Sequence, residues 1–317
     1  MRVIKTPALF SLALAAVSAS AVPFNAAQVP AAVAWVMHLD ADALRQTAPG
    51  RALMEQLGTG KGGQQMDALA AVLGWDMRRD LSGLTLFNTT GDEREGVALL
   101  RGRFDPARLE VLLKADPGYR SEVYQGTTVH AWIDQEKKQR RFGALVGDAA
   151  VVSGSKAAVQ RALDVLQARA PGLSTQNPNQ LPLPEPGAAF AMAAANLTRL
   201  PMTNNVPNAR TLRLARSGSF SMSEAAGQVI GRLSLQAERE ESARLMADAG
   251  RGLLAMALLD DAQDAASREL LQALRIEQAG PAVVLHLAMP AEKAAVWLRV
   301  QMEKDAQKKA AAAAAVE

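Results

Sequence analysis

The sequence predicts an α+β protein in which mainly antiparallel sheets are covered by helices on one face, arranged as two similar halves. Three observations predict this class. In several short segments, apolar and polar residues alternate as they do in strands. Turn signals join neighbouring strands into hairpins. The order of strands and helices also repeats on either side of a proline-rich segment, which suggests an internal duplication.

The N-terminus predicts a cleavable signal peptide over residues 1–21. Two basic residues precede an apolar stretch at residues 8–17, and the small residues 19–21 supply a cleavage pattern. The apolar stretch is too short for a transmembrane helix, which needs about 20 residues. The sequence contains no Cys, so no lipid anchor can follow. We expect a periplasmic or secreted mature chain that begins near Val22 and has no transmembrane segment.

Composition excludes several classes of site and partner. The absence of Cys rules out disulfides, thiolate metal ligands and cysteine nucleophiles. Loss of residues 1–21 removes Arg2 and Lys5, so 33 basic side chains remain against 32 acidic ones, compared with 35 and 32 in the full chain. Aromatic residues make up only 4%, too few for an obvious base-stacking surface. We therefore expect no nucleic-acid partner.

Residues 30–169 form the first predicted half. Strands are predicted at residues 33–40, 81–88, 96–104, 121–124, 127–134, 141–146 and 149–153. A helical pattern runs from 43 to 73, and the glycine-rich residues 58–63 interrupt it as a flexible connection. Asp105 and Pro106 begin another helix, as N-cap and first helical residue. A last helix follows Ser155, and its predicted buried stripe consists of Val159, Ala162, Leu163 and Leu166.

Proline density marks residues 170–187 as a linker or a long surface loop, because proline cannot sit inside helices or central strands. The second predicted half spans residues 188–304, and a Lys/Ala-rich tail, a helix extension or a frayed end, covers 305–317. Strands are predicted at residues 188–195, 211–223, 228–237, 274–278 and 282–289. A long helix from about residue 240 is expected to face the sheet with Leu245, Ala249, Leu253 and Met256.

Two short motifs resemble catalytic or phosphate-binding sequences but lack the accompanying residues. Ser153 and Lys156 match the S-x-x-K nucleophile motif of penicillin-recognising serine enzymes, yet the KTG and SDN motifs are absent. Ser153 or Ser155 as a helix cap is the simpler interpretation. Residues 58–63 (GTGKGG) lack the Gly and the Ser or Thr that a phosphate loop requires.

The three histidines, His38, His130 and His286, all fall in predicted strands. Acidic residues follow two of them, Asp40 and Asp134, so a metal site or an acid–base pair is one interpretation. No short ligand spacing is present, however, and His130 occupies the polar side of its own strand, as a solvated residue would. We therefore predict no metal, no cofactor and no catalytic residue.

Residues 136–141 (EKKQRR) form the densest basic cluster, at a predicted hairpin tip. Solvated hairpin tips commonly have this composition, and contact with an anion is the functional alternative.

The signal segment and residues 143–155 (GALVGDAAVVSGS), followed by an amphipathic helix, resemble uncharacterised exported bacterial proteins built from a duplicated α+β unit. The resemblance implies no substrate and no site residues.

Three classes of function follow from these observations. The first is a non-catalytic periplasmic binding or interaction protein, with a lipid, another apolar ligand or an envelope protein as partner, because a helix-covered sheet can hold an apolar cavity. The second is a structural or assembly protein of the cell envelope, which would expose an apolar patch. The third is a hydrolase, which would need Ser153, Lys156, His130 and Asp134 to converge.

Overall fold

The computed structural model describes residues 22–173, 181–185, 189–200, 209–260 and 262–314. The predicted signal peptide lies outside these residues. The strands are β1 (Trp35–Asp40), β2 (Leu81–Asn88), β3 (Val97–Gly102), β4 (Arg120–Tyr124), β5 (Thr127–Asp134), β6 (Gln139–Val146), β7 (Ala149–Ser153), β8 (Ala189–Asn196), β9 (Ala215–Ala225), β10 (Gln228–Ala237), β11 (Leu274–Ala279) and β12 (Ala282–Pro290). The α-helices are α1 (Ala41–Gln46), α2 (Ala48–Leu57), α3 (Gly60–Leu73), α4 (Met77–Asp80), α5 (Pro106–Lys114), α6 (Lys156–Leu166), α7 (Ala209–Leu212), α8 (Glu240–Leu259), α9 (Ala265–Ala273) and α10 (Ala291–Ala314).

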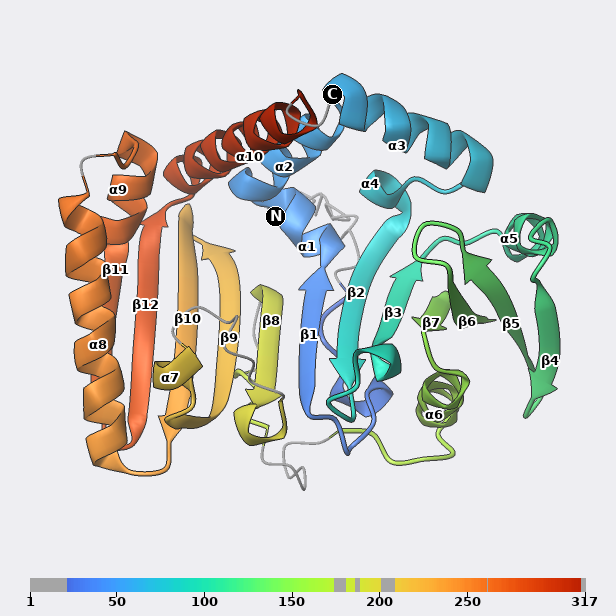
Figure 1. The fold of residues 1–317 in the computed structure, drawn as a ribbon, viewed down its shortest axis with the longest axis horizontal. Helices are drawn as coiled ribbons and strands as arrows, with labels where there is room; N and C mark the ends of the chain where they lie inside the picture. Colours follow the sequence, from blue (N-terminus) through green and yellow to red (C-terminus); the bar gives the residue numbers. More distant parts are fainter. Residues whose placement is uncertain (1–21, 174–180, 186–188, 201–208, 261, 315–317) are drawn as a thin grey trace, which may run out of the picture.

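Within the described residues the strands form one twelve-stranded sheet, in the order β11-β12-β10-β9-β8-β1-β2-β3-β7-β6-β5-β4 (Figure 1). The paired strands are antiparallel throughout. Glycines with positive φ occupy four of the hairpin turns, at Gly126, Gly147, Gly227 and Gly280, where a side chain would cost energy. The predicted α+β class with antiparallel strands is confirmed.

The two halves of the chain meet where β1 pairs with β8, the first strand of each half. Outward from this pair, the order is β1-β2-β3-β7-β6 in one half and β8-β9-β10-β12-β11 in the other, and β5 and β4 extend the first half further. The proline-rich segment therefore does not separate two sheets. The matching strand order supports the internal duplication, which stays a prediction.

Helix α6 covers the first half with the apolar stripe that its spacing predicts. Ser155 caps it, because its hydroxyl accepts a hydrogen bond from the backbone N–H of Ala158. Val159 and Leu163 are fully buried in a cluster that includes Val36 of β1 and strand residues further along the sheet. Burying one such side chain contributes about 1.5–3 kcal/mol.

Two residues within the proline-rich segment belong to this core. Leu173 and Leu181 are buried in the α6 cluster together with Val29, and Pro30 forms a backbone bridge with Gly172. The described ends of the predicted linker are therefore packed against the first half.

Helix α8 covers the second half from the opposite face of the sheet. Directly paired residues share a face, and the pairs lead from Val36 through Ala194, Ser219 and Ser234 to Val284. The neighbours of Val284 along β12 therefore point to the other side, and these residues, Val283 and Leu285, pack against α8. Helices thus lie on both faces, whereas the sequence predicts one. Strand β12 permits this because apolar side chains stand on both of its faces.

The predicted inward stripe of α8 is wrong. Leu245, Leu253 and Met256 are 57%, 46% and 69% exposed. The buried side of the helix consists of Ala243, Met246 and Ala247. The helix has two apolar stripes, and the one with smaller side chains faces the sheet.

Helix α10 runs through Ala314, so the described part of the predicted tail at 305–317 is a helix extension. Its first turns pack against α2 through small residues, among them Ala291, Ala295 and Ala52. Among the described residues, no helix is both long and apolar enough to cross a membrane.

Candidate functional site

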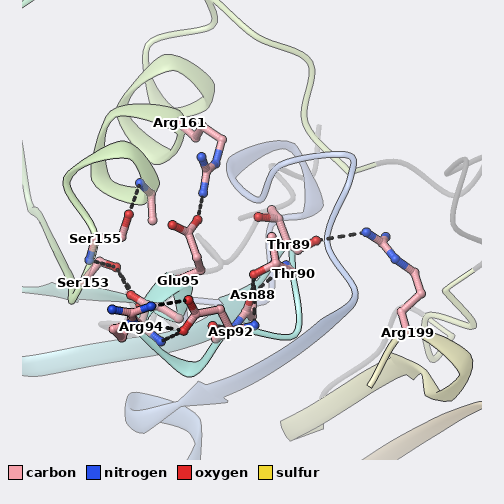
Figure 2. A network of polar contacts seen from close by, with 12 residues as sticks. Asn88, Thr89, Thr90, Asp92, Arg94, Glu95, Ser153, Ser155, Arg161 and Arg199 are labelled. Carbon is pink, nitrogen blue, oxygen red and sulfur yellow. Dashed lines mark hydrogen bonds and ion pairs between the residues drawn. The ribbon is translucent and has the colours of Figure 1, made fainter. Parts of the chain in front are cut away.

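Ser153 is the last residue of β7, and its hydroxyl forms hydrogen bonds with the local backbone (Figure 2). Its Oγ donates to the Gly96 carbonyl at 2.8 Å and accepts from the N–H of Ser155 at 3.1 Å. Lys156 instead forms an ion pair with Glu122 at 2.9 Å. The S-x-x-K match therefore corresponds to a turn and a helix start, in which hydroxyl and amine have different partners.

His130 and Ser153 lie on opposite faces of the sheet. Phe142 pairs with both Ser153 and Ala131, so these three side chains share a face, and His130 beside Ala131 points to the other. Asp134 shares the face of His130 but accepts the backbone N–H groups of the following turn at 3.0 and 3.1 Å. The structure does not bring the hydrolase candidates together.

The remaining histidines are held apart as well. His38 is buried, with Nδ1 2.9 Å from the Thr85 hydroxyl and Nε2 2.9 Å from the Val22 carbonyl oxygen. Burial lowers its pKa, so the neutral ring is favoured. His286 lies 3.8 Å from Glu277, in the second half. The described residues contain no cluster of three metal-ligating side chains.

An apolar cavity of about 240 Å³ lies between the sheet and helix α5. Its floor consists of strand side chains on the face of His130, and its roof comes from α5 and the segments around it. Large apolar side chains line most of it, among them Trp75, Leu100, Phe104, Leu109, Trp132 and Leu145. His130 is thus on a cavity wall, and the expectation that it occupies a solvated face is wrong. The neighbouring Trp132 on the same strand is the sequence signal for an apolar face.

Two stacked aromatic side chains line this α5 cavity. Trp75 and Phe104 stack with ring centres 5.5 Å apart. Gly74 ends helix α3 with a positive φ, and a side chain there would collide with Arg108. The Arg108 guanidinium in turn bonds the last carbonyls of α3, including that of Val72 at 2.9 Å. Helix α3 begins at Gly60. The glycine-rich residues 58–63, predicted to be a flexible connection, are therefore helical from Gly60 onward.

Two polar side chains line the α5 cavity. These are His130 and Glu110, and Glu110 forms an ion pair with Lys114 at 2.9 Å. The hydroxyl of Tyr119 lies 2.9 Å from Nδ1 of His130. Burial lowers the pKa of His130; Glu110 opposes this shift and Lys114 adds to it. The cavity therefore has mainly apolar walls, with two hydrogen-bonding side chains among them.

A second, larger cavity of about 590 Å³ lies beside the first, around the turn between β2 and β3. Trp35, Leu86 and Leu200 form apolar walls, and Glu93 and Arg141 contribute charge. Val152 lines both cavities, so they are neighbours on one face of the sheet.

Hydrogen bonds fix the loop that borders this β2–β3 cavity (Figure 2). The Asn88 side chain accepts from the N–H of Thr90 at 2.7 Å and donates to the Asp92 carbonyl at 2.8 Å. Arg199, from the second half, donates to the Thr89 carbonyl at 3.0 Å. The loop is therefore held from both halves of the chain.

The chain matches no protein-family model and no curated protein. Solved structures of TP0453 are similar in fold: crystal forms IV, III and I match 89% of this chain and 98%, 99% and 98% of their own. Their sequence identities are 11%, 10% and 12%, with TM-scores of 0.43, 0.42 and 0.40.

Proposed function

We propose that this protein is a non-enzymatic binding protein of the bacterial periplasm, or a secreted one, and that its ligand contains an apolar chain. The α5 cavity carries the proposal. Ligand sites are concave and mostly apolar, with a few polar groups that fix orientation, and this cavity combines two indole rings and a phenyl ring with the polar side chains of His130 and Glu110.

The hydrogen bonds and ion pairs of the polar residues support a binding function over a catalytic one. Ser153, Lys156 and Asp134 each serve a turn, a helix start or an ion pair. None of these groups points at a reacting centre shared with His130. A cavity without an assembled nucleophile and base suits recognition better than bond cleavage.

A shape test follows from the size of the α5 cavity. Ala150 is a half-buried residue on its floor, and Ala150→Phe would fill the space that an alkyl chain needs. We expect this variant to bind dodecanol, a neutral single-chain probe, about tenfold more weakly or worse. Displacement of a fluorescent naphthylamine dye measures the affinity.

Ala107→Phe is the matched control, because Ala107 is exposed on α5, the helix that covers the cavity, and lines neither cavity. It should bind dodecanol as the unaltered protein does, and thermal unfolding verifies that both variants fold. If the unaltered protein fails to bind dodecanol, or all three proteins bind it equally, the proposed function is wrong.

A second candidate function is assembly in the cell envelope. The exposed apolar stripe of α8, with Leu245, Leu253, Met256 and Leu259, is the observation that favours it, because exposed apolar patches mark interaction sites.

A further inference from the structure

We propose that the ligand is an amphiphile with a carboxylate or phosphate head, and that Arg141 of the neighbouring β2–β3 cavity receives this head. The inference rests on the proposed function, since the apolar chain occupies the α5 cavity. It adds the chemical class of the head and the residue that selects it.

Arg141 lies beside a wall residue of the α5 cavity. It pairs directly with Trp132 across β5 and β6, so both side chains point to the same face. Trp132 lines the α5 cavity, and Arg141 lines the β2–β3 cavity. A chain that lies along Trp132 would therefore end near the guanidinium.

The guanidinium has donors to spare. Its contact with Asp134 is long, 3.4 Å from Nε to the carboxylate. The other oxygen of that carboxylate serves the backbone of the turn. Within the described residues, no hydrogen bond is formed by the two terminal nitrogens of Arg141. Two parallel N–H groups match a carboxylate or phosphate, and their bonds are stronger for being charge-assisted.

The close neighbour of the guanidinium is a glycine. A Cβ built on Gly154 would lie 3.3 Å from a terminal nitrogen of Arg141 and 3.0 Å from the Arg94 carbonyl oxygen. Gly154 also lines the β2–β3 cavity. The glycine thus leaves room beside the arginine, which is 25% exposed. Partial burial strengthens the attraction for an anion because water screens it less.

The chain contains a matched control in the adjacent residue. Arg140 has the same charge but points to the opposite face, where it lines a separate hollow with Phe142 and Lys156. The basic cluster that the sequence shows at 136–141 is thus divided by the strand between two faces, and only one of its two arginines meets the cavities.

The experiment compares dodecanoate, dodecyl phosphate and dodecanol, which share one chain and differ in the head. Their affinities for the unaltered protein, Arg141→Met and Arg140→Met are measured by the same dye displacement. We expect Arg141→Met to lose dodecanoate or dodecyl phosphate affinity by about tenfold or more, with dodecanol unchanged. Arg140→Met should bind all three probes normally.

The outcomes separate the two proposals. If the unaltered protein binds an anionic probe more tightly than dodecanol and only Arg141→Met loses that preference, the role of Arg141 is supported, and the anion that binds more tightly identifies the head class. If the unaltered protein and Arg141→Met bind the anionic probes equally well and both still bind dodecanol, only the proposed role of Arg141 is wrong. Failure of dodecanol to bind overturns the proposed function as well.

Discussion

Helices α6 and α8 cover opposite faces of one sheet with side chains of different size. Helix α6 inserts Val159, Leu163 and other large residues into a core that both ends of the proline-rich segment also enter. Helix α8 faces the sheet with Ala243 and Ala247, and Met246 is its one large buried side chain. The first contact is a filled core, whereas the second is a close approach of helix and strand.

The close approach of α8 is visible at Gly250. A Cβ built there would lie 3.2 Å from the Cδ1 of Ile276 on β11. Small residues along this side of the helix let its backbone come near the sheet, and the larger apolar residues then remain on the outside. The large apolar residues of the two helices therefore have different roles. Those of α6 are buried and stabilise the fold, whereas most of those of α8 form an exposed surface.

The strongest test of this difference is Leu163→Ala in α6. Leu163 is fully buried, so truncation leaves a cavity and should lower the free energy of unfolding by about 2–5 kcal/mol. Urea unfolding followed by circular dichroism measures it. Leu253→Ala in α8 makes the same chemical change at a side chain that is 46% exposed, and it should cost much less. Equal losses would mean that both helices contribute to the core in the same way.

A second test enlarges the close contact. Ala247 is fully buried against the sheet, so Ala247→Leu should force α8 outward and lower the free energy of unfolding by about 1–3 kcal/mol. The control is Ala255→Leu, at an exposed position of the same helix, which should leave the unfolding midpoint nearly unchanged. If Ala247→Leu is as stable as the unaltered protein, the helix does not lie as close to the sheet as the small residues imply.

The comparison also explains which parts of the fold could be predicted. In α6 a single apolar stripe exists, so spacing alone identifies Val159, Ala162 and Leu163 as buried. In α8 two stripes exist, and spacing cannot decide between them. The choice depends on the distance to the strand beneath, which is a tertiary property. Burial of larger apolar side chains gains more free energy from their transfer out of water. In α8, however, the close approach of the helix backbone to the sheet decides which side is buried.

The candidate site is harder to predict than the fold. Alternation and turn signals predict the antiparallel strands, because both are local in the sequence. The α5 cavity instead joins Trp75 and Phe104 with Trp132, which lie in different segments. No short motif links them. Alternation assigns His130 to a solvated face because the residues directly beside it in the sequence are apolar and point to the opposite face. Both faces of β5 are apolar in part, however, and helix α5 covers the one with Trp132.

The smallest expected effect concerns the outer stripe of α8. Replacing Leu253 and Met256 together by serine should change the free energy of unfolding by no more than about 0.5 kcal/mol per site, as for other surface positions. The same double variant should bind less to a hydrophobic column if the stripe is an open apolar surface. Urea unfolding and retention time measure the two effects. A large loss of stability would show that these side chains are buried against a further part of the folded chain, and α8 would then resemble α6 after all. Unchanged stability with weaker retention would leave the stripe as a contact surface for assembly, separate from the cavities on which ligand binding depends.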